Sequence, residues 1–362
     1  MKHNYLLLLF FMTFRLFAQI PEGYYDAAEG LDGYTLKTAL KTIIDDIDDS
    51  SGQAFHDTSV TYSQLWTLYQ TSDVRTDGKV WDVYSDCDFE FGIDQDNGTG
   101  GTVECDKYNR EHTFPRSWFG NNQNHPIFAD AFHILPTDKK VNAERGNLAF
   151  GEVSSASYTS LNGSQRGSTD LSGPVGEVFE PVDDYKGDIA RGLFYIAVRY
   201  QEDVASWETN DTNGNSMLDG TSNKVFEQWA LDLLYSWHIN DPVSTKEIDR
   251  NNAIFEHQDN RNPFIDHPEY VSAIWQEELS VNEYQTNVEP SFYPNPVNGN
   301  TLYIDTSFDL EIQIYSVLGK LTLEKQVSNT ENKIDISKLN SGIYLVKLQY
   351  QNQSVTKKLI KQ

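Results

Sequence analysis

The spacing of apolar residues changes near residue 280 of this 362-residue chain. Before that point, apolar residues recur at helical intervals in residues 34–47, 62–69, 188–201, 223–237, 244–258 and 267–275. After it, short runs alternate between apolar and polar residues, namely 301–305, 311–315, 321–327, 333–336, 342–349 and 355–360. The alternation predicts a small C-terminal β-sandwich. Residues 280–290 are polar and lack periodicity, which predicts a linker between the two patterns.

The first part of the chain mixes both kinds of pattern. Residues 80–84 and 89–93 resemble strands, as does the approach to Glu111, and most of the helical segments follow them. This order predicts a mixed α+β domain over residues 20–279 and a separate domain over residues 291–362.

The N-terminus has the features of a secretory signal. Lys2 and His3 precede a short apolar run, and the small residue Ala18 lies near the end of that run. The run is too short to span a bilayer as a helix, so we interpret residues 1–19 as a signal peptide. No later segment is apolar enough to cross a membrane, and we expect an exported protein.

The chain contains two cysteines, Cys87 and Cys105. In an exported protein, an even pair at this spacing favours a disulfide over a metal site. A disulfide that closes a loop of this length would stabilise the fold by roughly 3 kcal/mol.

The charge of the chain argues against a surface that binds polyanions in general. Lys and Arg number 28 against 54 Asp and Glu, and the formal net charge is -26. Any contact with nucleic acid must therefore be local. Residues 107–146 are a local exception, because they carry six Lys and Arg against four Asp and Glu.

Two segments, residues 108–119 and 130–147, carry the groups needed to cut a phosphodiester. Such a reaction needs a proton acceptor for the attacking water and positive charge at the phosphoryl oxygens. His112 suits the first task, because an unperturbed imidazole is largely neutral near pH 7. Glu111 and Asn142 suit the second, because Mg²⁺ binds oxygen ligands and keeps several waters.

The local geometry separates the roles of these residues. Neighbouring side chains on a strand point to opposite faces, so Glu111 and His112 favour a division of labour, one on a metal and the other on the water. The segment that begins at Thr137 looks helical, with Thr137 as its N-cap. On that helix Asn142 and Arg145 share a face.

These segments closely resemble the secreted endonuclease I family, a branch of the His-Me finger (ββα-metal) nucleases. The matching segments are residues 109–119, 130–138, 141–153, 187–191, 241–244 and 260–270. The resemblance implies a ββα-metal nuclease core with additional helices, in keeping with the α+β class. It also implies non-specific cleavage of DNA, and often of RNA, and we expect 5′-phosphate ends.

The resemblance assigns roles to individual residues. It implies that His112 is the general base and that Glu111 and Asn142 hold Mg²⁺, for which Mn²⁺ or Ca²⁺ would substitute. Some family members contact the phosphate through an arginine, and Arg116 and Arg145 are both candidates here. We expect supporting hydrogen bonds from three further residues, namely Asp130, His133 and Asn147.

The end of the chain resembles the C-terminal sorting domain of proteins exported by type IX secretion. The resemblance rests on residues 292–297, 314–320 and 339–344 and on the basic end 357–361. It implies a secreted or cell-surface protein that the type IX secretion machinery recognises. We expect a monomer that acts on DNA, and on RNA, and has no stable membrane span.

Other interpretations stay open. The chain could be a non-catalytic binding or adhesion protein that retains the nuclease fold, or its terminal sandwich could bind carbohydrate. His112, His125 and His133 are zinc-type ligands, although their spacing matches no familiar zinc site. Residues 211–219 alternate oxygen ligands as calcium loops do, but Ser222 stands where an EF-hand has its acidic twelfth residue.

Overall fold

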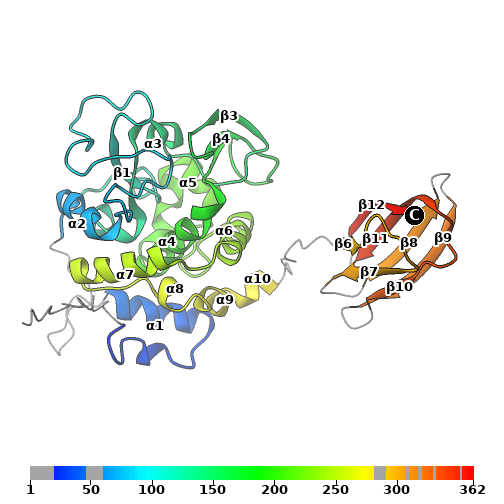
Figure 1. The fold of residues 1–362 in the computed structure, drawn as a ribbon. Helices are drawn as coiled ribbons and strands as arrows, with labels where there is room; N and C mark the ends of the chain where they lie inside the picture. The colour runs from blue at the N-terminus through cyan, green and yellow to red at the C-terminus, as the bar shows by residue number, and fades with distance from the viewer. Residues whose placement is uncertain are drawn as a thin grey trace, which may run out of the picture. The chain divides into compact units, whose positions relative to one another are not determined.

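The computed structural model describes residues 20–45, 60–280, 291–306, 310–316, 320–328, 332–350 and 353–362 (Figure 1). The chain divides into two compact units, Met1–Glu283 and Tyr284–Gln362, called here the N-terminal unit and the C-terminal unit. The predicted signal peptide, residues 1–19, and nearly all of the predicted linker lie outside the described residues.

The described part of the N-terminal unit contains more helix than strand. The α-helices are α1 (Gly33–Asp45), α2 (Leu65–Ser72), α3 (Lys139–Arg145), α4 (Lys186–Arg199), α5 (Thr212–Met217), α6 (Gln228–Asn240), α7 (Thr245–Gln258), α8 (Pro263–Asp266), α9 (Tyr270–Ile274) and α10 (Gln276–Ser280). Short 3₁₀ helices are η1 (Asp26–Ala28), η2 (Tyr62–Gln64), η3 (Pro126–Phe128), η4 (Ala131–His133), η5 (Asp183–Tyr185) and η6 (Val204–Asn210). Each helical segment expected from the sequence contains a helix. Residues 46 and 47 of the first segment lie outside the described residues, and the other ends differ by a few residues.

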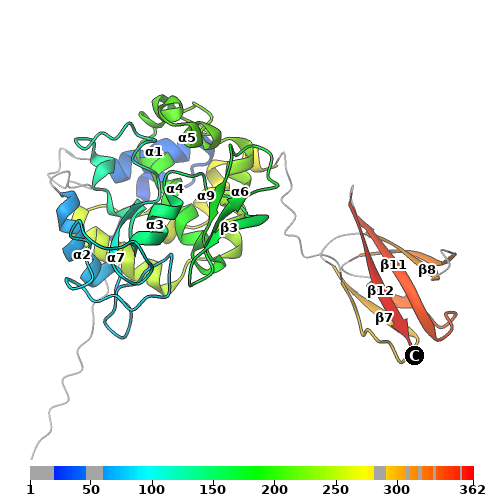
Figure 2. The ribbon, with the colours of Figure 1, turned by 90° about the horizontal axis from the view of Figure 1, so that it is seen from above.

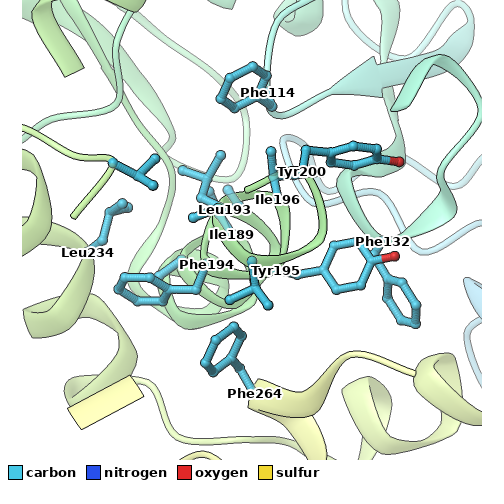
Figure 3. Close-up of a cluster of buried hydrophobic side chains, with 14 of the residues drawn as sticks. Phe114, Phe132, Ile189, Leu193, Phe194, Tyr195, Ile196, Tyr200, Leu234 and Phe264 are labelled. Atoms are coloured by element: carbon cyan, nitrogen blue, oxygen red, sulfur yellow. The ribbon is translucent and has the colours of Figure 1, made fainter. Parts of the chain in front are cut away.

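The core of this unit is built around α4, which lies in its middle with α3 and α1 on different sides (Figures 1 and 2). Almost every residue of α4 is buried, as the continuous apolar run from Leu193 to Val198 requires. Figure 3 shows Phe132, Leu234 and Phe264 around its side chains and Phe114 above them, and these residues of one core cluster come from segments far apart in the sequence. The helix therefore ties the segment around residue 114 to the later helices.

Two small antiparallel sheets flank these helices. Strand β1 (Tyr108–His112) pairs with β2 (Ile134–Asp138), and the register places Glu111 opposite Leu135. A second sheet has the order β3 (Ser155–Thr159), β4 (Gln165–Ser168) and β5 (Val178–Glu180). The expected mixture of helices and strands is therefore confirmed, with β1 leading into the segment around His112 as the sequence suggested.

The strands expected at residues 80–84 and 89–93 are not formed. One backbone hydrogen bond, from Val80 N to Phe89 O at 3.0 Å, joins the two segments. Within the first segment, Asp82 accepts hydrogen bonds from the backbone N–H of Tyr84 and from the Ser85 hydroxyl. These local bonds offer the backbone an alternative to a strand ladder, so the segment turns instead.

The disulfide between Cys87 and Cys105 is confirmed, with Cα atoms 5.1 Å apart. It lies beside the start of α3, where the Asp138 carboxylate accepts a hydrogen bond from the Cys105 N–H at 2.7 Å. Asp138 also accepts bonds from Lys140 N and Val141 N, which makes it the N-cap of α3. The prediction that Thr137 caps this helix is wrong, because Thr137 belongs to β2 and the helix begins two residues later.

The C-terminal unit consists of two antiparallel sheets. Its strands are β6 (Ser291–Tyr293), β7 (Thr301–Asp305), β8 (Leu310–Ser316), β9 (Leu321–Val327), β10 (Lys333–Asp335), β11 (Gly342–Tyr350) and β12 (Gln353–Lys361). The orders are β10-β7-β6 and β12-β11-β8-β9, and buried side chains from both sheets form one core. Every alternating run expected from the sequence forms a strand, and β6 is an addition.

Candidate active site

An open cavity of about 650 Å³ lies around β1 in the N-terminal unit. Four consecutive residues of β1 line it, from Asn109 to His112, so the cavity reaches both faces of the strand. Asn142 from α3 lies on the same wall, as does Arg116. The structure thus brings together the residues that the sequence singled out on two separate segments.

Glu111 is buried and held in place from behind. Its Oε1 lies 3.1 Å from Nη1 of Arg145 and 3.3 Å from the hydroxyl of Tyr84. Burial raises the pKa of Glu111 to about 7, and the nearby Arg145 guanidinium opposes that rise. Oε1 of Glu111 is therefore occupied by the Arg145 guanidinium and the Tyr84 hydroxyl.

A phosphate contact would have to lie at the cavity wall, and Arg145 does not. It is fully buried, and its guanidinium donates hydrogen bonds to the carbonyl oxygens of His112 and Thr113 at 3.1 and 2.7 Å. Its Cζ also lies 4.6 Å from the centre of the Phe150 ring. Arg145 shares a helix with Asn142 as expected, but its long side chain passes beneath β1 and fixes the end of that strand.

His112 is oriented by a backbone carbonyl. Its Nε2 lies 3.1 Å from the carbonyl oxygen of Phe128. A carbonyl can only accept, so Nε2 carries the hydrogen and Nδ1 keeps the lone pair of the neutral ring. Burial, with a contribution from the neighbouring His133, holds the pKa of His112 well below its usual range. The ring is therefore uncharged near neutral pH.

His133 packs against His112, and Asp130 lies close to His133. The rings of His112 and His133 lie 5.3 Å apart, and Nε2 of His133 bonds to the Ile127 carbonyl oxygen at 2.7 Å. Burial lowers the pKa of His133 to about 4. Asp130 accepts hydrogen bonds from the hydroxyls of Tyr195 and Tyr200, both at 2.9 Å. The bond from Tyr195 connects Asp130 to α4.

Asn142 is oriented by a residue of β1. Its Nδ2 donates to Oδ1 of Asn109 at 2.8 Å and lies 3.4 Å from the Thr137 hydroxyl oxygen. Both contacts use the amide nitrogen, so the amide oxygen is the atom left for a ligand. Asn109 therefore acts as the residue that sets which way this amide faces.

Asn147 connects the cavity to residues 211–219. Its Nδ2 donates to Oδ2 of Asp211 at 2.6 Å, and its Oδ1 accepts from Asn213 at 3.3 Å. The other oxygen of Asp211 accepts from the backbone N–H of Asn213 and Gly214, so Asp211 is the N-cap of α5. The oxygen-rich pattern of this segment is explained by a capped helix that braces Asn147.

Arg110 and Arg116 differ from the other arginines. Within the described residues, every other arginine has a carboxylate oxygen within 4.0 Å, and these two have none. Both line the cavity. In a chain with a net charge of -26, unpaired guanidinium groups gathered at one cavity mark the place where an anion can approach.

The donor set fits a hard cation held by few protein groups. The wall offers a carboxylate from Glu111 and an amide oxygen from Asn142, and Mg²⁺ is commonly held by one or two such groups together with water and substrate phosphate. Across the part of the chain that the structure describes, no three His, Cys, Asp or Glu side chains gather as a metal cluster. A carboxylate and an amide oxygen on one wall are donors of the kind that such a cation uses.

Several cavity residues were given no role from the sequence, and they include Tyr62, Trp66, Asn109 and Arg110. Asn109 and Arg110 immediately precede Glu111, and the period of a strand indicates that Arg110 shares a face with His112. Tyr62 and Trp66 come from η2 and α2, more than forty residues earlier in the chain. No local pattern in the sequence connects them to this wall.

Comparison with known proteins identifies both units. The Endonuclease I family profile matches residues 32–269, and the secretion system C-terminal sorting domain profile matches residues 291–362. The extracellular ribonuclease of Bacillus subtilis (strain 168) is 36% identical over 257 residues, which cover 70% of this chain and 78% of that protein. The extracellular ribonuclease of Bacillus amyloliquefaciens is 35% identical over 259 residues, with the same coverage of 70% and 78%.

The two matches agree with the sequence patterns. The C-terminal unit is a type IX secretion sorting domain, so the protein is secreted or lies at the cell surface. No helix among the described residues is both long and apolar enough to cross a membrane. The whole wall of the cavity falls within residues 32–269, and the chain belongs to the endonuclease I family.

Proposed function

We propose that this protein is a secreted, metal-dependent endonuclease that hydrolyses phosphodiester bonds in RNA and DNA without strong sequence preference. The observation that carries the proposal is a single cavity wall that combines Glu111, His112 and Asn142 with two arginines, Arg110 and Arg116, that have no carboxylate oxygen within 4.0 Å in the part of the chain that the structure describes. The names of the two Bacillus relatives support RNA as a substrate. A phosphodiester backbone is common to RNA and DNA, so we expect both to be cut.

His112 is the proposed general base. The Phe128 carbonyl holds the hydrogen on Nε2, which leaves Nδ1 to accept a proton from water. The low pKa of this buried ring keeps it neutral and ready to accept that proton at neutral pH. The activated water attacks phosphorus, the bond to the 3′ oxygen breaks, and the products carry a 5′-phosphate and a 3′-hydroxyl.

Glu111 and Asn142 are the proposed ligands of Mg²⁺, with Mn²⁺ or Ca²⁺ as substitutes. When bound, the ion supplies positive charge to the phosphoryl oxygens and to the departing 3′ oxygen. Arg145 and Tyr84 fix the carboxylate of Glu111, and Asn109 fixes the amide of Asn142. The chain thereby holds both ligands in place before substrate arrives.

Arg116 is the proposed phosphate contact. It is exposed, lines the cavity and lies with its Cζ 5.2 Å from the ring centre of Phe128, the residue whose carbonyl orients His112. Arg145 is better described as a positioning residue, because burial keeps it from the substrate. Asp130, His133 and Asn147 support the site through the contacts given above.

We also interpret the antiparallel pair β1–β2 followed by α3 as the ββα-metal unit of a His-Me finger nuclease. The order of these elements and the residues they carry support this interpretation. The two sheets of the C-terminal unit fit a β-sandwich, since their inner side chains share one core. We propose that the mature enzyme acts as a monomer after recognition by the type IX machinery.

The proposal is tested by incubating plasmid DNA and RNA with the mature protein in Mg²⁺ or EDTA. We expect the wild type to cut both in Mg²⁺ and neither in EDTA. His112→Ala should lose at least about a hundredfold in rate, the usual contribution of a general base. His267→Ala, which removes a half-exposed histidine outside the cavity, is the matched control.

The alternative of a non-catalytic binding protein makes the opposite prediction. Such a protein would bind nucleic acid or a surface without any metal-dependent cutting. Equal rates for the wild type and His112→Ala would refute the assignment of His112 as the general base. Cutting in EDTA would refute the proposed requirement for a metal ion.

A further inference from the structure

An arginine held against two aromatic rings forms one side of the cavity. The Cζ atom of Arg110 lies 3.5 Å from the centre of the Tyr62 ring and 4.3 Å from that of the Trp66 ring. Its Nη1 also donates to the Tyr62 carbonyl oxygen at 2.5 Å. All three side chains are half-buried and line the cavity. The guanidinium is thus fixed against the rings and cannot sample many positions.

The charge of Arg110 has no acidic partner within this cluster. Asp96, another residue of the cavity wall, attracts Arg110 electrostatically, but its carboxylate forms an ion pair with Lys139 at 2.9 Å. Within the described residues, Arg110 has no carboxylate oxygen within 4.0 Å, in contrast to Arg75 or Arg166. A partly buried cation without an ion pair is costly, and a polyanionic ligand would offset that cost.

This cluster adjoins the proposed general base. Arg110 and His112 are two residues apart on β1 and share a face of the strand. The Tyr62 ring lies 5.3 Å from the His112 ring at an interplanar angle of 29°. A nucleotide in contact with Tyr62 and Arg110 would therefore neighbour the phosphate that His112 helps to hydrolyse.

We propose that Tyr62, Trp66 and Arg110 form a nucleotide subsite, in which the base next to the scissile bond stacks on this cluster. Aromatic rings and guanidinium planes bind unstacked bases in many nucleic-acid proteins, largely without regard to sequence. A base in a duplex is already stacked and paired, and it must leave its helix to enter the cavity. The subsite therefore favours single-stranded substrates over duplex DNA. This inference rests on the proposed function and names the part of the substrate that the site binds.

The test must separate stacking from simple attraction of phosphate. Arg110→Lys keeps the positive charge but removes the planar guanidinium. Tyr62→Leu removes the ring, and Tyr62→Phe keeps it. Arg75→Lys is the matched control, because Arg75 lies outside this cavity and pairs with Asp77 and Asp88.

Binding is measured by fluorescence anisotropy in EDTA, with His112→Gln present in every protein so that no hydrolysis is required. The ligands are a short single strand, the same strand with abasic sites in its middle, and the corresponding duplex. We expect the abasic strand and the duplex to bind at least about fivefold more weakly than the intact strand, as loss of one base stack predicts. Arg110→Lys and Tyr62→Leu should abolish this discrimination, and Tyr62→Phe and Arg75→Lys should retain it.

Two results would overturn the proposal. One is equal binding of the intact and abasic strands by the His112→Gln protein. The other is full discrimination by Arg110→Lys and Tyr62→Leu, whose folding is checked by circular dichroism. Because discrimination is a ratio of two affinities for one protein, partial loss of folded protein does not alter it. Failure of the wild type to cut in Mg²⁺ would instead refute the proposed hydrolysis and leave these binding results standing.

Discussion

A buried arginine organises the residues around the proposed active site. Arg145 joins the Glu111 carboxylate to the carbonyl oxygens at the end of β1, so one side chain fixes both the proposed metal ligand and the strand that carries the base. The sequence predicts that Arg145 faces the same way as Asn142, and helical spacing is enough for that. The sequence cannot predict that the Arg145 side chain is buried, because burial of a guanidinium depends on acceptors that the fold brings from other segments.

Asn109 provides a test of how Asn142 is oriented. Asn109→Ala removes the acceptor at 2.8 Å from Nδ2 of Asn142, so the amide can rotate and its oxygen is less often turned to the metal. We expect the Mg²⁺ concentration for half-maximal activity to rise about tenfold or more, with little change in thermal stability. Asn109→Asp keeps an acceptor and serves as the control. Identical Mg²⁺ titrations for the wild type and Asn109→Ala would show that the contact does not position the ligand.

His238 makes the N-terminal unit sensitive to acid. Burial, helped by Arg191, lowers the pKa of His238 to about 4 from its ordinary value of 6.5. Between these pH values the unfolded chain binds more protons at this residue than the folded chain does. The contribution of His238 to the free energy of unfolding is therefore fully present above pH 6.5 and declines as the pH falls toward 4. The contribution of this one residue between pH 6.5 and 4.5 is about 2 kcal/mol.

The measurement is urea unfolding of the wild type and His238→Gln at pH 6.5 and 4.5. We expect the free energy of unfolding to fall less in the variant, by about 2 kcal/mol. His267→Gln, at a half-exposed position, should follow the wild type. A variant whose stability falls as steeply as that of the wild type would remove His238 as an acid-sensitive group.

At the scale of elements, the helices, the strand β1 and the C-terminal strands were predictable, and the strands β2 to β5 were not. Strand β2 contains Pro136, which argues against a strand in sequence reasoning, yet it pairs only with β1 and needs few ladder bonds there. Strands β3 and β4 are short and rich in polar and small residues, and β5 has only three residues, so no alternation marks them. In the C-terminal unit one face of each sheet is buried. Apolar and polar residues therefore alternate along these strands, and this alternation can be seen in the sequence.

The disulfide supports the element that carries Asn142. Replacing both Cys87 and Cys105 by Ser opens a loop with a sequence separation of 18 next to the N-cap of α3. We expect the free energy of unfolding of the N-terminal unit to fall by about 3 kcal/mol, as measured by urea denaturation. A reducing agent should lower the stability of the wild type by the same amount and leave the double variant unchanged. If reduction has no effect on the wild type, the disulfide does not stabilise this unit.

At the scale of the whole molecule, an acidic protein must attract a polyanion through a small part of its surface. The sequence located that part, since residues 107–146 are less acidic than the chain as a whole. It could not tell which cations are available there. In the fold Lys139 and Lys140 pair with Asp96 and Glu144, and Arg145 is buried. Lys107 lies outside the cavity and donates to the carbonyl oxygen of Ile93. Among the described residues, Arg110 and Arg116 are thus the cations of this segment that line the cavity. We therefore expect the site to engage only a short length of strand.

Salt dependence tests this local view of the charge. Each phosphate contact with a single strand contributes about 0.7 to the slope of log affinity against log salt concentration. In the His112→Gln protein in EDTA, Arg110→Gln and Arg116→Gln should each reduce the magnitude of that slope by about 0.7. Arg75→Gln changes the net charge by the same amount at a position paired with Asp77, and it should leave the slope unchanged. If Arg75→Gln changes the slope as much as the cavity variants do, attraction is spread over the surface and the two cavity arginines have no special part in it.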